Sequence, residues 1–85
     1  KANNNGIEYA DYLDKNLKGT YRVSASDGLN LRSGAGTNYK ILATMPNKST
    51  VNCYGYYSIC NGVKWYYLTY NGLVGFASSN YLKKL

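Results

Sequence analysis

Histidine is absent from this chain of 85 residues, and acidic residues are scarce. Without an imidazole, neither a Ser-His-Asp nor a Cys-His catalytic arrangement can form. Two cysteines cannot supply a four-thiolate zinc site, and zinc sites that need histidine are excluded as well. The carboxylates belong to Glu8, Asp11, Asp14 and Asp27. A glycosidase-type acid–base pair would have to come from these four, so we expect no enzyme, no catalytic residue, no metal site and no cofactor.

Long apolar runs are also missing. The longest fall far short of the ~20 residues that a membrane-spanning helix requires, so we expect no insertion into a membrane. The length suits one small domain with a modest core. The chain starts at Lys1 and shows no signal-peptide pattern, and we interpret it as a fragment of a larger protein.

Positive charge is concentrated in one part of the chain. Residues 1–18 hold equal numbers of lysines and carboxylates, whereas residues 19–85 hold seven cations against Asp27 alone. The net charge of +6 therefore belongs to the second segment. Such a surface attracts polyanions, and the attraction weakens as salt rises.

The first eighteen residues differ from the rest in composition and in the spacing of apolar residues. Residues 1–6 are small and polar, as in a linker. Apolar residues then recur near a period of 3.6, at Ile7, Ala10, Leu13 and Leu17. This spacing predicts a short helix over residues 7–18, with Asn5 and Gly19 at its ends. Because isolated helices of this length are marginal, a linker with fluctuating helix is the alternative.

From residue 19 onward the pattern is that of β-strands. Polar and apolar residues alternate over residues 20–25, 29–32 and 41–45. Two Asn-Gly pairs, at 61–62 and 71–72, stand between β-forming segments and predict tight hairpins. Short strands at this spacing predict an all-β barrel or sandwich.

Cys53 and Cys60 leave three arrangements open. A hairpin reversal at Tyr56-Tyr57 would let them form a disulfide. A single extended strand would hold them too far apart to bond. We favour a third arrangement, in which a long loop holds Cys60 away from the strand.

Aromatic residues are too numerous for the core alone. Residues 19–85 contain nine tyrosines, Trp65 and Phe76. In the segment 65–70, Trp65 and Tyr67 share one strand face, and Leu68 lies on the other. Leu68 indicates that its own face is the core, so we expect Trp65 to point outward.

Residues 28–39, GLNLRSGAGTNY, resemble the opening signature of bacterial SH3 domains (SH3b, type 3). The resemblance continues through Trp65-Tyr66 and Tyr70-Asn71-Gly72 and closes on residues 74–82, VGFASSNYL. It covers residues 19–85 and leaves residues 1–18 uncovered.

The resemblance implies a small, mostly antiparallel SH3-like β-barrel at residues 19–85, after a linker or short helix at residues 1–18. It implies a non-catalytic module that targets a peptidoglycan hydrolase, such as an endolysin, autolysin, amidase or muramidase, to the wall of a Gram-positive bacterium. The expected partners are peptidoglycan, the fused catalytic domain and, as an anionic wall polymer, teichoic acid. The expected location is outside the cell, at the bacterial cell wall.

We expect the wall ligand to bind a groove of exposed rings and asparagine amides. The candidates are Asn38, Tyr39, Tyr56, Tyr57, Trp65, Asn80 and Tyr81. We place Tyr56 and Tyr57 on a loop before Asn61. Arg32 and Lys64 are candidate anion contacts, and for Arg32 a structural role, in which it holds loop carbonyls, is equally open.

Two other classes of function stay open. The closing segment is also similar to that of eukaryotic SH3 domains, but Ser78 replaces their groove proline and no acidic loop is present. A module that binds a partner's peptide is therefore the alternative function. A basic barrel with stacking rings also suits single-stranded nucleic acid, although we expect no nucleic-acid partner here.

Overall fold

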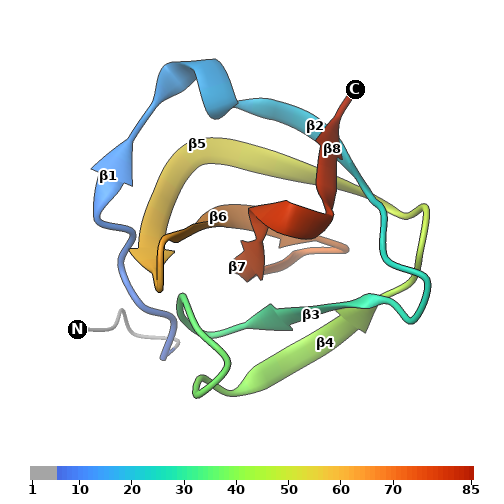
Figure 1. Ribbon diagram of the computed structural model, residues 1–85, viewed down its shortest axis with the longest axis horizontal. Helices are drawn as coiled ribbons and strands as arrows, with labels where there is room; N and C mark the ends of the chain where they lie inside the picture. The colour runs from blue at the N-terminus through green and yellow to red at the C-terminus, as the bar shows by residue number, and fades with distance from the viewer. Residues whose placement is uncertain (1–5) are drawn as a thin grey trace.

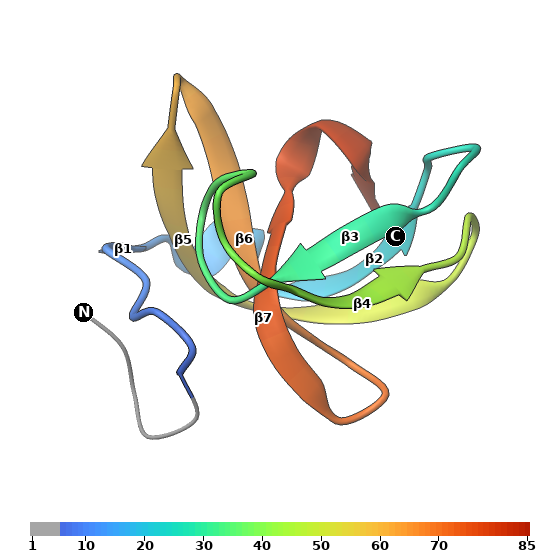
Figure 2. The same ribbon diagram turned by 90° about the horizontal axis from the view of Figure 1, so that it is seen from below.

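The computed structural model describes residues 6–85, which form one antiparallel β-sheet rolled into a barrel (Figures 1 and 2). The strands are β1 (Tyr12–Leu13), β2 (Gly19–Val23), β3 (Leu29–Arg32), β4 (Ile41–Met45), β5 (Thr50–Cys60), β6 (Val63–Tyr70), β7 (Leu73–Ser78) and β8 (Leu82–Lys84). Two 3₁₀ helices, η1 (Lys15–Leu17) and η2 (Ser79–Tyr81), are the only helical turns in this part of the chain. The predicted all-β, SH3-like class is confirmed.

The strands follow one another in space in the order β4-β3-β7-β6-β5-β2-β8, and β1 pairs with β5. The hairpins β5–β6 and β6–β7 turn at the two Asn-Gly pairs, as predicted. Asn61 and Gly62 have φ values of 52° and 78°, and the second pair has 48° and 81°. Positive φ at both central residues is the geometry of a type I′ turn, whose twist matches that of the flanking strands.

The hydrophobic core lies on one face of the sheet, called here the inner face. Its largest fully buried members include Val23, Leu31, Met45, Val51 and Leu68. Tyr21 is also buried there, and its hydroxyl donates to the carbonyl oxygen of Leu17 at 2.8 Å. A buried phenol therefore keeps a hydrogen-bond partner, as burial requires.

Residues 6–18, called here the N-terminal strap, do not form the predicted helix. The Glu8 amide donates to the Ser33 carbonyl at 2.7 Å, and the Asp11 amide donates to Ser58 Oγ at 3.0 Å. Farther along, β1 pairs with β5, and only the three residues of η1 are helical. Figure 1 shows the strap running along the outside of β5.

The helix prediction was wrong because the barrel offers the strap better partners. An isolated helix of this length is marginal in water, whereas β5 and the Ser33 carbonyl supply hydrogen bonds, and Ile7 becomes buried. Gly19 begins β2 and caps no α-helix. Asn5, the predicted N-cap, lies outside the described residues.

The strap also changes the environment of Trp65. Trp65 and Tyr67 do lie on the face opposite Leu68, as the strand alternation predicted, and we call this the outer face. However, Ile7 and Phe76 pack against Trp65, which is only 8% exposed. The expectation that Trp65 points into solvent was therefore wrong, because the strap covers that part of the outer face.

Both cysteines lie on β5 and are free. Cys53 is buried in the core, and Cys60 is the last residue of the strand. The favoured long loop between them was wrong. The extended-strand arrangement holds instead, and it keeps the two thiols too far apart to bond.

Candidate binding groove

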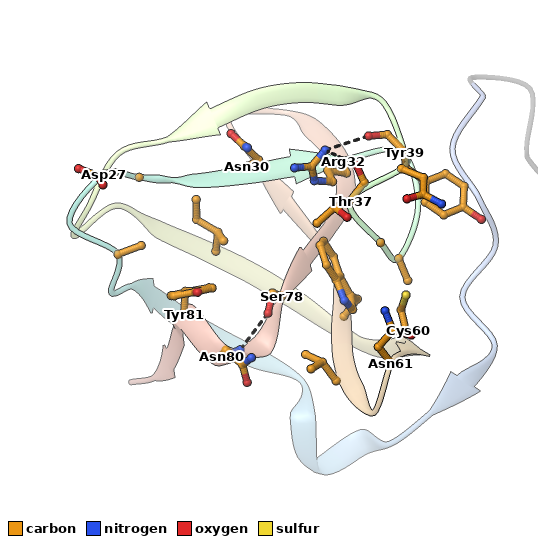
Figure 3. Close-up of a pocket in the computed structure, with 18 of the residues that line it drawn as sticks. Asp27, Asn30, Arg32, Thr37, Tyr39, Cys60, Asn61, Ser78, Asn80 and Tyr81 are labelled. Atoms are coloured by element: carbon orange, nitrogen blue, oxygen red, sulfur yellow. Dashed lines mark hydrogen bonds between the residues drawn. The ribbon is translucent and has the colours of Figure 1, made fainter.

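A groove of about 840 Å³ lies on the outer face where β3, β6 and β7 meet the loop of residues 33–40 and η2. Figure 3 shows its two walls: Asn30 and Arg32 of β3 with Thr37 and Tyr39 of the loop on one side, Asn80 and Tyr81 on the other. Ser78 lies between the walls. Asp27 lies at one end, and Cys60 and Asn61 lie at the other.

Six of the nine predicted site residues line this groove: Arg32, Asn38, Tyr39, Trp65, Asn80 and Tyr81. They come from β3 with the loop that follows it, from β6 and from η2, three segments that are far apart in sequence. Tyr39 and Tyr81 are 38% and 47% exposed, so their rings are available to a ligand. Trp65 contributes only the small part of its surface that the strap leaves uncovered.

Arg32 holds the loop in place. Its Nη1 atom donates to the carbonyl oxygens of Thr37 and Tyr39, each at 3.1 Å. The structural role left open by the sequence is therefore present. The guanidinium keeps further N–H donors (five in all), so contact with an anion stays a prediction.

Two local contacts orient the aromatic walls. The ring of Tyr39 lies over Gly34, where an added Cβ would stand 2.6 Å from the ring. At the other wall, Ser78 Oγ accepts a hydrogen bond from the backbone N–H of Asn80 at 3.3 Å and caps η2. Ser78 is buried, and its hydroxyl holds the turn that carries Tyr81.

The other three predicted residues lie outside the groove. Tyr56 and Tyr57 are part of β5 and not of a loop, which corrects their expected setting. The Tyr57 ring packs against Tyr12 at 5.3 Å between centroids, and Lys64 Nζ lies 5.0 Å from the Tyr57 centroid. Tyr56 lines a small hollow of about 220 Å³ with Glu8, Tyr9, Ala10 and Tyr67. Their part in binding stays a prediction.

Several lining residues escaped the sequence reasoning, among them Asn30, Asn61, Val63 and Ser78. Asn30 had a usable signal, because a residue two before Arg32 on a strand shares its face. Asn61 had one as well, since the turn of a predicted hairpin is exposed. Nothing local indicated that these turns and strands converge on one hollow.

The groove carries amides and hydroxyls but almost no net charge. Its charged residues are Arg32 and Asp27, one of each sign. Burial raises the pKa of Tyr21, Cys53, Tyr66 and Tyr67, and all four lie outside the groove. Among residues 6–85 no group of three or more carboxylate or thiol side chains is placed to hold a metal ion. Nor does this part of the chain contain a helix able to cross a membrane.

A small all-β barrel with an open, nearly neutral groove is the architecture of a binding module. Residues 27–83 match the family model of the bacterial SH3 domain. The match covers more than half of the chain, which therefore belongs to the bacterial SH3 domain family, a family of generally non-catalytic binding domains. A comparison with curated proteins found no match.

Proposed function

We propose that the groove binds peptidoglycan and that the domain holds a peptidoglycan hydrolase on the bacterial cell wall, outside the cell. The family supports this proposal at the coarse level, because bacterial SH3 domains are often involved in cell-wall binding. The observation that carries it is the composition of the groove, whose lining contains both aromatic rings and side-chain amides.

The lining suits a polymer of sugars and short peptides. Four asparagines line the groove, at positions 30, 38, 61 and 80. Each side-chain amide can donate and accept hydrogen bonds, and peptide and acetamido groups need both. The Tyr39 and Tyr81 rings add flat apolar area with a polar hydroxyl at the end. Because the charges of Arg32 and Asp27 balance, the groove favours a largely neutral ligand.

The test is retention on purified sacculi from which teichoic acid has been removed. We expect the double substitution Asn80→Ala, Tyr81→Ala to weaken retention by about ten-fold or more, since each lost contact is worth roughly 1 kcal/mol. Both side chains are exposed, so the fold should be kept. Trp65 is unsuitable for this test because it packs against Ile7 and Phe76.

Tyr12→Ala is the matched control. Tyr12 is 51% exposed, as accessible as Tyr81, but packs on Tyr57 outside the groove. We expect it to leave retention unchanged. Equal retention of the wild type and the groove variant would overturn the proposal. Failure of the wild type to bind protein-free sacculi would point to the alternative, a module that binds a partner's peptide.

A further inference from the structure

The positive charge of the domain does not lie in the groove. Of the cations within residues 6–85, only Arg32 lines it, and Asp27 balances that charge. A separate set of cations stands at the β2–β8 edge of the sheet, where β8 is the last strand. We call Arg22, Lys83 and Lys84 the basic edge.

The pairing of the strands brings these cations together. Arg22 on β2 lies directly opposite Lys83 on β8, and Tyr21 lies opposite Lys84. Directly opposed residues share a face, with Cβ atoms about 5 Å apart. Arg22 and Lys83 are both exposed. Lys84 follows on the other face of β8, and its side chain passes beside Gly19 so that the ammonium donates to the Asn16 carbonyl at 2.6 Å.

Among residues 6–85, no negative group neutralises Arg22 and Lys83. On its other side, Arg22 pairs with Thr50 of β5, which is uncharged. The next residues on that face, Thr20 and Asn52, hydrogen bond to each other. Within residues 6–85 no carboxylate forms an ion pair with either cation. Like charges in direct opposition destabilise a sheet, so the fold tolerates this pair at some cost.

Protection of an exposed strand edge explains only part of the arrangement. Lysines on an edge strand discourage pairing with another chain, and this accounts for Lys83 and Lys84 on β8. It does not account for Arg22, because β2 is paired on both sides, with β5 and β8. Edge protection therefore does not explain why Arg22, the residue opposite Lys83, is a cation.

We propose that the basic edge is a second binding site, separate from the groove, for a polyol-phosphate chain of the wall such as teichoic acid. Arg22 and Lys83 form an open surface pair that lies in neither the groove nor the small hollow. Such an open pair suits successive phosphates of a polymer better than one small ion. Each contact releases counterions from the polymer, so this binding depends on salt. The assignment of the polymer to the wall rests on the proposed function, whereas the site itself does not.

The test titrates the whole chain with soluble poly(glycerol phosphate) across a salt series. We expect the double variant Arg22→Gln, Lys83→Gln to bind about ten-fold more weakly at low salt. The slope of log Kd against log salt should fall by about 1.4, because two phosphate contacts are lost. The matched control is Lys40→Glu, which lowers the net charge by the same two units at one exposed position away from this edge. It should keep most of the affinity.

Three outcomes would overturn the second site. Equal losses in the edge and control variants would show that only net charge matters. If the edge variant bound the polymer as tightly as the wild type, the basic edge would have no part in the interaction. Binding to vesicles containing phosphatidylglycerol, with none to the polymer, would favour a membrane surface instead.

The groove variant Asn80→Ala, Tyr81→Ala separates the two proposals. If it still binds poly(glycerol phosphate) but not stripped sacculi, the two sites are distinct and both proposals stand. If it loses the polymer as well, the separate site is wrong. If the wild type binds the polymer but not stripped sacculi, the result supports the binding site at the basic edge and contradicts peptidoglycan as the groove ligand.

Discussion

At the residue scale, Cys53 and Cys60 of β5 differ in burial, and we expect their thiols to differ in reactivity. Cys53 is 4% exposed, and burial raises the pKa of its thiol to about 12. Cys60 is half-buried at the end of β5 and lines the groove. Because the thiolate is the reactive form, position along the strand should separate the two residues.

We predict one rapidly reacting thiol per native chain at pH 8. Cys60 should react with a disulfide reagent such as DTNB, and Cys53 should react only after denaturation. A Cys60→Ser variant should remove the fast phase and leave the slow one. Two fast thiols, or fast labelling of the Cys60→Ser variant, would contradict the burial of Cys53.

Single-residue roles were predictable where the argument was local. The two roles assigned to Arg32 followed from its place beside a glycine-bearing loop, and the hydrogen bonds to Thr37 and Tyr39 show the structural one. The exposure of Trp65 was not predictable, because a distant segment covers its ring. Strand alternation fixes which face a side chain is on, but not what lies against that face.

At the scale of elements, β3 and β7 approach closely at a glycine of β7. A Cβ added at Gly75 would stand 2.7 Å from the Arg32 carbonyl oxygen and 3.0 Å from the Leu31 and Leu42 side chains. Arg32 pairs with Phe76, the next residue of β7. Any side chain at position 75 would therefore push the two strands apart.

We predict that Gly75→Ala lowers the free energy of unfolding by about 1–3 kcal/mol, as overpacking in cores does. Gly62→Asn is the control: nothing lies within 4 Å of an added Cβ, and asparagine tolerates the φ of 78° in the turn. It should change stability by less than about 1 kcal/mol. Denaturant unfolding measures both, and a neutral Gly75→Ala would show that the strands can separate freely.

The strap shows why the helix prediction failed at this scale. Its apolar spacing fits a helix, but Ile7 is buried on the outer face while the strap runs as extended chain. Local periodicity competes with the hydrogen bonds that an existing sheet offers, and for so short a segment the sheet prevails. The hairpins were predicted correctly because their turn chemistry is complete within two residues.

For the whole molecule, the strap joins a second apolar cluster to the barrel. Ile7, Trp65 and Phe76 are buried together on the outer face, apart from the main core. In a domain of this size, such a cluster is a considerable share of the buried apolar surface. The barrel is therefore expected to depend on residues that the family match, which begins at residue 27, does not include.

We predict that Ile7→Ala lowers the free energy of unfolding by about 2 kcal/mol, at the low end for a buried isoleucine. Since Trp65 is the single tryptophan, its emission should shift to longer wavelength as water gains access. Tyr9→Ala is the control, because Tyr9 is a 56% exposed residue of the same strap. It should change neither the free energy of unfolding nor the emission wavelength of Trp65. A chain that begins at residue 19 should lose at least as much stability as Ile7→Ala. Unchanged stability of both would show that residues 1–18 act only as a linker.

The sequence by itself determined the all-β class, the hairpin turns and the two faces of residues 65–70, because these depend on neighbours within a few residues. Only the tertiary structure decided the extended strap, the covered Trp65 and the separation of the basic edge from the groove. Those features arise where β5, β8 and the strap meet partners far away in the chain. No local sequence pattern predicts these long-range contacts, since they depend on how the whole sheet closes into a barrel.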